Sequence, residues 1–161
     1  MNSIEVRSDG RGLRVGLVVA RFNPEITERL LEGCARRLGE LGCREPDVLR
    51  VAGAFEIPLA AQQAARSGRY DALVAIGAVI RGDTAHFDYV CQGVTEGVAR
   101  VALDCAVPIA FCVLTTDDDE QALARSARPG EPGANKGREA ADVAVEMARL
   151  LESLRGGSGR G

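Results

Sequence analysis

Apolar residues along the chain follow two alternating patterns. Four runs rich in aliphatic residues predict strands over 13–20, 48–52, 72–80 and 108–115, and the first has the composition of a buried parallel strand. Apolar residues recur at three- and four-residue spacing in five further segments, which predicts helices over 24–41, 57–67, 87–102, 119–126 and 138–154. Because strands that alternate with helices form βαβ units, we expect an α/β fold with a parallel sheet covered on both faces.

The pattern continues without a break, so we expect one domain over residues 1–155. A chain of 161 residues can bury roughly two thirds of the surface that its unfolded form exposes. The chain has no internal repeat and no linker that would divide it. The final GGSGRG, residues 156–161, is typical of a flexible tail.

Charge and cysteine content narrow the classes of function. The net charge of -3 argues against nucleic acid or an anionic membrane as the main partner, although a local basic pocket remains compatible with a phosphorylated substrate. No segment reaches the length of a membrane span, and the N-terminal dozen residues lack the apolar core of a signal peptide. Five cysteines without a CxxC pair predict neither a disulfide framework nor a zinc site, so we expect a cytoplasmic protein.

Aromatic residues gather where a ligand is expected. Ligands of such sheets bind beyond the carboxyl ends of the strands, and the loops at that edge are 21–23, 53–56 and 81–86. Phe22, Phe55 and Phe87 each follow a predicted strand closely. Phenylalanine is most often a core residue, but three in equivalent loops favour a flat heterocycle held by stacking.

The same loops carry the polar candidates. Glu56 lies in an apolar stretch, where it is either plain surface or a carboxylate that needs donors from a ligand. Gly82 permits an unusual backbone angle, and free amides with the Thr84 hydroxyl suit a phosphate, whereas Asp83 would have to turn away as a helix cap. A helix cap alone also explains this Gly-Asp-Thr.

His86 is the only histidine of the chain. A lone histidine is usually structural, but in this loop it is the natural proton shuttle. No cluster of metal-binding residues accompanies it, so the sequence does not predict a metal site.

Three further candidates lie outside those loops. Arg125 and Lys136 flank the loop SARPGEPGAN, where a surface role is the default for either. Phe111 lies early in the fourth strand, too far from its carboxyl end to reach the loops of its own chain. If Phe111 binds the ligand, it does so from a neighbouring chain, which points to a site shared between subunits.

Six segments together resemble the lumazine synthase family, in register over about residues 13–150. They are ARFN (20–23), GAFEIP (53–58), GAVIRGDTAHFDYV (77–90), VLTTD (113–117), EQA (120–122) and ANKG (134–137). The resemblance implies a three-layer, flavodoxin-like fold with strand order 2-1-3-4 and pentamers as the basic assembly. It also implies condensation of 5-amino-6-(D-ribitylamino)uracil with 3,4-dihydroxy-2-butanone 4-phosphate to 6,7-dimethyl-8-ribityllumazine, the penultimate step of riboflavin biosynthesis, without a metal or organic cofactor.

The resemblance also implies residue roles. Phe22 would stack on the pyrimidine, and the other contacts to that substrate would come from Ala54, Phe55 and Glu56 of the ribityl-binding loop and from the backbone of Ala78, Val79 and Ile80. Asp83 and Thr84 match positions that contact the butanone phosphate, largely through main-chain amides, and His86 would be the proton donor. Arg125, which pairs with the phosphate, would come from the adjacent subunit, together with Phe111 and Lys136 at the pyrimidine substrate.

Some positions depart from the usual family pattern. Ala52 replaces a common proline, Ala85 stands where proline or threonine is frequent, and Cys112 follows Phe111. The segment 125–136 is longer than in members that build icosahedral shells, which favours an isolated pentamer.

Other functions remain open on this scaffold, because fold alone does not fix function. They are a non-catalytic flavin- or lumazine-binding module, a structural container and an archaeal-type riboflavin synthase. His86 together with Arg125 argues against a pure binder, and the longer loop argues against a container. The intact ARFN and GDTAHF segments favour lumazine synthase over riboflavin synthase.

Overall fold

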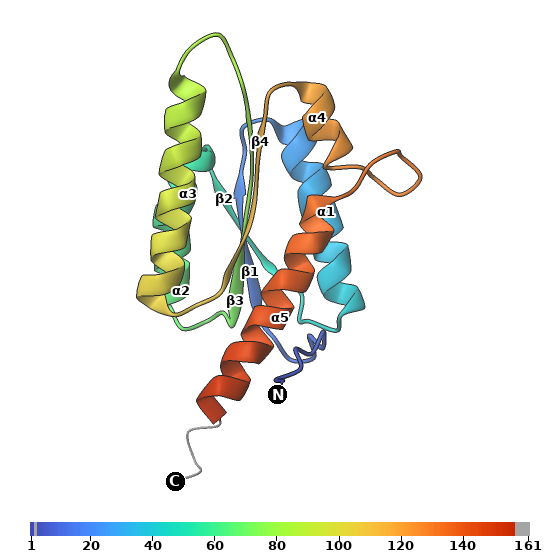
Figure 1. Cartoon of the computed structure of the whole chain (residues 1–161), viewed down its shortest axis with the longest axis vertical. Coiled ribbons are helices and arrows are strands. Elements are labelled where there is room, and N and C mark those ends of the chain that lie inside the picture. The colour runs from blue at the N-terminus through green and yellow to red at the C-terminus, as the bar shows by residue number, and fades with distance from the viewer. Residues whose placement is uncertain (2, 157–161) are drawn as a thin grey trace.

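The computed structural model describes residue 1 and residues 3–156, and its centre is a four-stranded sheet (Figure 1). The strands are β1 (Val15–Ala20), β2 (Asp47–Val51), β3 (Ala72–Ile80) and β4 (Ile109–Thr116). All neighbouring pairs are parallel, and the order across the sheet is β2-β1-β3-β4. The parallel sheet and the strand order 2-1-3-4 are therefore confirmed.

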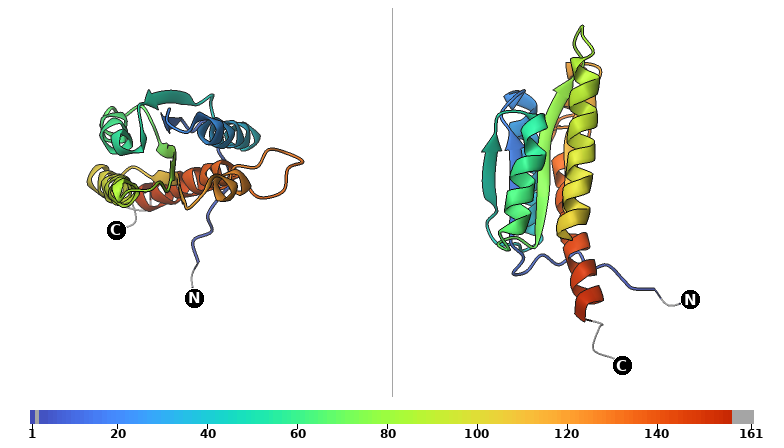
Figure 2. Two further views of the ribbon diagram at one scale, coloured as in Figure 1. Left: turned by 90° about the horizontal axis from the view of Figure 1, so that it is seen from above. Right: turned by 90° about the vertical axis from the view of Figure 1, so that its left-hand side faces the viewer.

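Helices cover both faces of the sheet, as the pattern predicted. They are α1 (Pro24–Glu40), the one-turn 3-10 helix η1 (Ala54–Glu56), α2 (Ile57–Arg66), α3 (His86–Cys105), α4 (Asp119–Ala124) and α5 (Lys136–Gly156). In Figures 1 and 2, α1, α4 and α5 lie against one face, and α2 and α3 lie against the other. The result is the three-layer α/β architecture expected from the sequence.

Two buried clusters hold these layers together. Leu17 of β1 packs among residues of α1 and α5, whereas Val18, its neighbour in the chain, packs with α2 and α3 on the opposite face. Every residue of β1 is buried. A strand in the middle of a parallel sheet is covered on both faces, which is why its sequence is uniformly apolar instead of alternating.

Element boundaries differ from the predicted ones in a few places. The loop predicted after β2 contains η1, and α4 ends at Ala124, two residues earlier than expected. The last helix begins at Lys136, two residues earlier than expected, and continues through Gly156, the first residue of the predicted tail. The rest of that tail, 157–161, lies outside the described residues.

The carboxyl ends of the strands meet at the upper end of the view in Figure 1, where the loop between β3 and α3 and the segment between α4 and α5 also lie. Residue 1 and the last turn of α5 lie toward the opposite end. All five cysteines are unpaired. Within residues 1 and 3–156, no helix combines the length and apolar character needed to cross a membrane.

Candidate functional site

A cavity of about 630 Å³ opens at the carboxyl ends of β1, β2 and β3, and we call it the strand-end pocket. That volume lies within the range of small-molecule sites. Its walls come from the three loops that the sequence singled out and from the first turn of α3. The lining residues are Phe22, Asn23, Ala52, Gly53, Ala54, Phe55, Glu56, Ala78, Val79, Ile80, Gly82, Thr84, His86, Phe87, Tyr89 and Val90.

Phe22 lines this pocket and is 71% exposed. Its backbone N–H donates to the carbonyl of Ala52, which ties the loop after β1 to the loop after β2. Asn23 adopts a left-handed backbone conformation (φ 55°) and donates from Nδ2 to the carbonyl of Ala78 at 2.9 Å. Asn23 occupies the N-cap position of α1, but its side chain does not cap the helix. It anchors the Phe22 loop to the end of β3 instead.

The other two phenylalanines differ from Phe22. Phe55 is 60% exposed, and its ring lies on Gly93 of α3, where a Cβ atom would come within 3.0 Å of the ring carbon Cδ2. Phe87 is only 8% exposed and lies in the first turn of α3, with the guanidinium of Arg81 4.2 Å from its ring centre. The expectation of three equivalent aromatic loops is therefore wrong for Phe87, whose ring is covered by its own chain.

Glu56 already has a donor within the chain. Its Oε2 accepts a hydrogen bond from the backbone N–H of Gly53 at 2.9 Å, which stabilises the start of η1. The residue is nevertheless exposed and lines the pocket. One carboxylate oxygen thus holds the loop while the side chain stays accessible to a ligand.

The segment between β3 and α3 differs from the helix-cap interpretation. Ala85 is the N-cap residue of α3, and no side chain caps the helix, so the expected cap role of Asp83 is wrong. Gly82 does not adopt a positive φ, so the unusual backbone angle is also absent. The backbone N–H of His86 donates to Oγ1 of Thr84 at 3.4 Å. Thr84 and His86 line the pocket and are exposed, whereas Asp83 is exposed but does not line it.

Arg81 braces this segment against its neighbours. Its backbone N–H donates to the carbonyl of Thr116, the last residue of β4. Its side chain reaches Asp117 at 2.9 Å and Asp88, in the first turn of α3, at 3.3 Å. The hydrogen bond to the Asp117 carboxylate raises the pKa of Arg81, which strengthens its preference for the charged form. The loop that carries Thr84 and His86 is thus attached at both ends.

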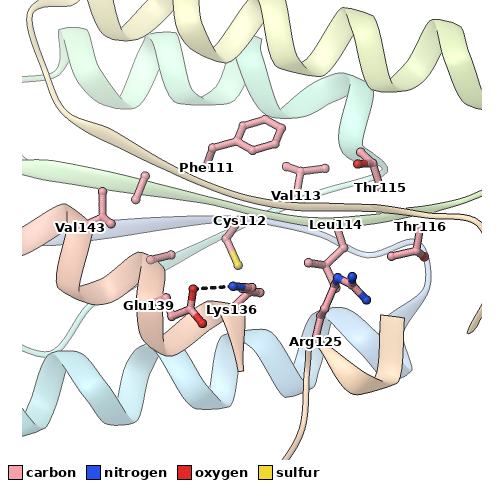
Figure 3. Close-up of a pocket in the computed structure, with 12 residues that line it drawn as sticks. Phe111, Cys112, Val113, Leu114, Thr115, Thr116, Arg125, Lys136, Glu139 and Val143 are labelled. Atoms are coloured by element: carbon pink, nitrogen blue, oxygen red, sulfur yellow. Dashed lines mark hydrogen bonds and ion pairs between the residues drawn. The ribbon is translucent and has the colours of Figure 1, made fainter. Parts of the chain in front are cut away.

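A second cavity, of about 350 Å³, follows the free edge of β4, and we call it the β4-edge pocket (Figure 3). Phe111 projects to one side of the strand, and Cys112 projects to the other, toward Arg125 and Lys136. The full lining is Ala110, Phe111, Cys112, Val113, Leu114, Thr115, Thr116, Arg125, Lys136, Glu139, Ala140 and Val143. Phe111 is 44% exposed although it is apolar, and β4 is an edge strand of the sheet formed by the described residues.

Two cations lie close together in the β4-edge pocket. Arg125 donates from its guanidinium to the carbonyl of Gln121 at 3.0 Å, and Lys136 pairs with Glu139 at 2.7 Å. The backbone N–H of Lys136 donates to the carbonyl of Arg125 at 2.9 Å, which joins the two residues directly. Burial raises the pKa of the Cys112 thiol to about 12, so this thiol is not a nucleophile at neutral pH.

The two pockets share no lining residue. Most predicted site residues line the strand-end pocket, whereas Phe111, Arg125 and Lys136 line the β4-edge pocket. Phe111 faces Ala75 in the register of β3 and β4, far from the carboxyl end of its strand, as the sequence predicted. Within residues 1 and 3–156, no cluster of three His, Cys, Asp or Glu side chains is placed to hold a metal ion.

Some pocket residues were not predicted, although the sequence contained a signal for them. Tyr89 and Val90 follow His86 by three and four residues, the spacing that places side chains on the same helix face. Glu139 follows Lys136 by three residues and forms the ion pair that this spacing allows. Asn23 gave no comparable signal, because its hydrogen bond to Ala78 depends on how β1 and β3 pair.

Comparison with known proteins agrees with this arrangement. The family model for 6,7-dimethyl-8-ribityllumazine synthase matches residues 12–152. A 6,7-dimethyl-8-ribityllumazine synthase of Salinibacter ruber is 50% identical over 147 residues, which cover 90% of this chain and 92% of that protein. The matched region includes every strand and both pockets. The chain therefore belongs to the 6,7-dimethyl-8-ribityllumazine synthase family.

Proposed function

We propose that the protein makes 6,7-dimethyl-8-ribityllumazine at a site formed by the strand-end pocket of one chain and the β4-edge pocket of a neighbouring copy. As a member of this family it is a transferase, and its substrates are small molecules. The observation that carries the shared site is the division of the predicted residues between two pockets without a common lining residue.

The strand-end pocket suits the ribitylaminouracil. Phe22 offers an exposed ring face for the pyrimidine, and the backbone at the end of β3, from Ala78 to Ile80, offers hydrogen-bonding groups to the edge of the ring. The loop with Ala54, Phe55 and Glu56 would receive the ribityl chain, since an accessible carboxylate can accept hydrogen bonds from its hydroxyls. Phe111 and Lys136 of the neighbouring copy would close this site.

The phosphorylated substrate requires positive charge, and the strand-end pocket has no lysine or arginine in its lining. Arg125 of the neighbouring copy would supply that charge, since a guanidinium binds phosphate through paired hydrogen bonds. Thr84 and the backbone at Asp83 would hold the phosphate from the first chain. The Asp83 carboxylate is outside the pocket lining, which lessens its repulsion of a phosphate.

The chemistry then needs positioning and proton transfer. The 5-amino group of the uracil attacks the ketone, and water leaves to give an imine. Phosphate then departs by elimination, and the ribitylamino nitrogen attacks the carbonyl that results, closing the ring with loss of a second water. His86 lines the pocket beside Thr84 and would donate a proton to the departing group. Holding both substrates together supplies much of the remaining acceleration. No cofactor is part of this scheme.

A site of this kind requires an oligomer, and we propose a homopentamer. Five chains of 17.0 kDa would form a particle of about 85 kDa. The long loop between Arg125 and Lys136 supports a pentamer over a larger shell. We place the protein in the cytoplasm, where the five unpaired thiols are stable.

The direct test is to mix both substrates with the purified protein and follow lumazine absorbance and fluorescence. We expect formation well above the uncatalysed rate, and a rate equal to the blank would contradict the proposed function. Light scattering on the same sample measures the assembly, and a monomer that is fully active would contradict the shared site.

A further inference from the structure

We propose that Asn135 is a positioning residue for the phosphate-binding half of the site. Its side chain fixes the loop 126–135 against α1 and thereby sets the positions of Arg125 and Lys136. The inference rests on the proposed function, in which Arg125 and Lys136 contact the substrates bound in the strand-end pocket of a neighbouring copy.

The side-chain amide of Asn135 is fully used within the chain. Its Nδ2 donates to the carbonyl of Arg29 in α1 and to the carbonyl of Ala127, both at 3.1 Å. Its Oδ1 accepts from the backbone N–H of Arg138, in the first turn of α5, at 3.2 Å. One partly buried side chain therefore joins α1, the loop and α5.

Both cations lie at the base of the loop that Asn135 fixes. Ser126 and Asn135 form an isolated antiparallel bridge, and Arg125 and Lys136 are the residues immediately outside it. The backbone N–H of Lys136 donates to the carbonyl of Arg125, and that of Ala134 donates to Ala124, each at 2.9 Å. A shift of Asn135 would therefore move Arg125 and Lys136 together.

Two glycines leave room for this arrangement. A Cβ atom on Gly33 of α1 would lie 2.7 Å from Nδ2 of Asn135 and closer still to Oδ1. A Cβ atom on Gly137 would overlap the carbonyl oxygen of Leu30 in α1. The Asn135 amide thus occupies space that any side chain at Gly33 would take.

The other links between the loop and α1 are weaker anchors. Arg29 pairs with Glu131 at 2.6 Å and Arg128 pairs with Glu32 at 2.9 Å. At least one partner of each pair is 41% or more exposed, and exposed ion pairs contribute little to stability. Figure 2 shows the loop projecting beyond α1; these ion pairs link its outer part to that helix, whereas Asn135 links its base to the same helix.

Loss of this anchor would reduce phosphate affinity more than catalysis. Without the amide, the carbonyls of Arg29 and Ala127 lose a donor, and the base of the loop loses this attachment to α1 while its own backbone hydrogen bonds remain. Binding then has to order the two cations, which lowers affinity. His86 and Phe22 lie in the other pocket of the chain and keep their places.

The experiment compares Asn135→Ala and Gly33→Ala with Gly39→Ala as the matched control. Gly33→Ala displaces the same amide from a different helix, whereas a Cβ atom on Gly39, also in α1, meets nothing within 4 Å. Each variant is assayed for lumazine formation, and inorganic phosphate binding is measured separately by calorimetry. Melting temperature and particle mass verify folding.

We expect both test variants to raise the KM for the butanone phosphate and the Kd of inorganic phosphate about tenfold, the scale of one lost hydrogen bond to a charged group. The kcat should change by less than about threefold, since the proton donor is untouched. Gly39→Ala should behave as the wild type. Unchanged phosphate affinity in folded Asn135→Ala, or a fall in kcat alone, would overturn the inference.

If Asn135→Ala does not fold, the single variants Asn135→Asp and Gly33→Ala test the inference instead. Asp at this position keeps the acceptor oxygen and removes the two N–H donors. Failure of the proposed function is recognised separately, because the wild type would then form no lumazine. The calorimetric comparison would still measure how the Asn135 substitutions change the Kd of inorganic phosphate.

Discussion

The strand-end pocket and the β4-edge pocket differ in what they offer a substrate. The first is the larger, at about 630 Å³, and is lined by aromatic rings, strand-end backbone and the only histidine, without a lysine or arginine. The second is about 350 Å³ and lies along β4, with Arg125, which follows α4, and Lys136, which begins α5, in its lining. The strand-end pocket lacks cationic side chains, and the β4-edge pocket lacks the histidine. Neither pocket alone therefore suits a pair of substrates of which one is phosphorylated.

The two pockets also differ in how their residues are held. In the strand-end pocket, short segments follow directly from the strands of the sheet, of which β1 is fully buried, and a hydrogen bond from Asn23 to Ala78 joins the segment after β1 to the end of β3. In the β4-edge pocket, the cations flank a long loop, and the apolar ring of Phe111 is left uncovered. Exposed apolar surface beside charged groups is typical of an interface, which agrees with assembly at this edge.

Removal of the Arg125 guanidinium should have the largest effect. We expect Arg125→Ala to weaken binding of the butanone phosphate by about 1.5–3 kcal/mol, the range for hydrogen bonds to charged groups, and to leave kcat nearly unchanged. Steady-state kinetics with that substrate varied measures the effect. Arg128→Ala is the control, because Arg128 lies on the same loop but does not line the pocket. An unchanged KM in Arg125→Ala would remove Arg125 from the site.

Removal of the His86 imidazole should have a smaller effect, and this effect should be on kcat instead of KM. We expect His86→Ala to lower kcat by about tenfold or more, the lower end of general acid–base contributions, with some activity left because imine formation needs no enzyme group. The KM for the butanone phosphate should stay close to the wild-type value. A single-turnover measurement separates this loss from slower product release, and an unaltered rate would exclude His86 from the mechanism.

The sequence predicted the fold and brought out most of the residues that line the two pockets, because strands, helices and the loops between them follow from local pattern. The apolar runs predicted β1 and β3 as strands, and the resemblance to the family supplied the strand order that places them in the centre; the segment GAVIRGDTAHFDYV leads from the end of β3 into α3. The prediction that Phe111 lies far from the strand-end loops is confirmed, because the distance of a residue from the end of its strand follows from its position in the sequence.

The errors concern features that depend on tertiary contacts. Asp83 is a residue type that often caps helices, but α3 begins at His86 and its N-cap residue is Ala85. No side chain forms a capping hydrogen bond there. Phe87 looks like a loop aromatic, but Arg81 and the core cover it. The role of Asn135 also depends on the absence of a side chain at Gly33, more than 100 residues away.

The most direct test of the shared site is to assemble His86→Ala and Arg125→Ala chains together in equal amounts. If each site takes His86 from one chain and Arg125 from its neighbour, about a quarter of the sites in random pentamers contain both groups. Activity at low butanone phosphate should then rise to about a quarter of the wild-type value, above that of either parent. Activity that stays at the mean of the two parents would show that both groups act within one chain and would contradict the account.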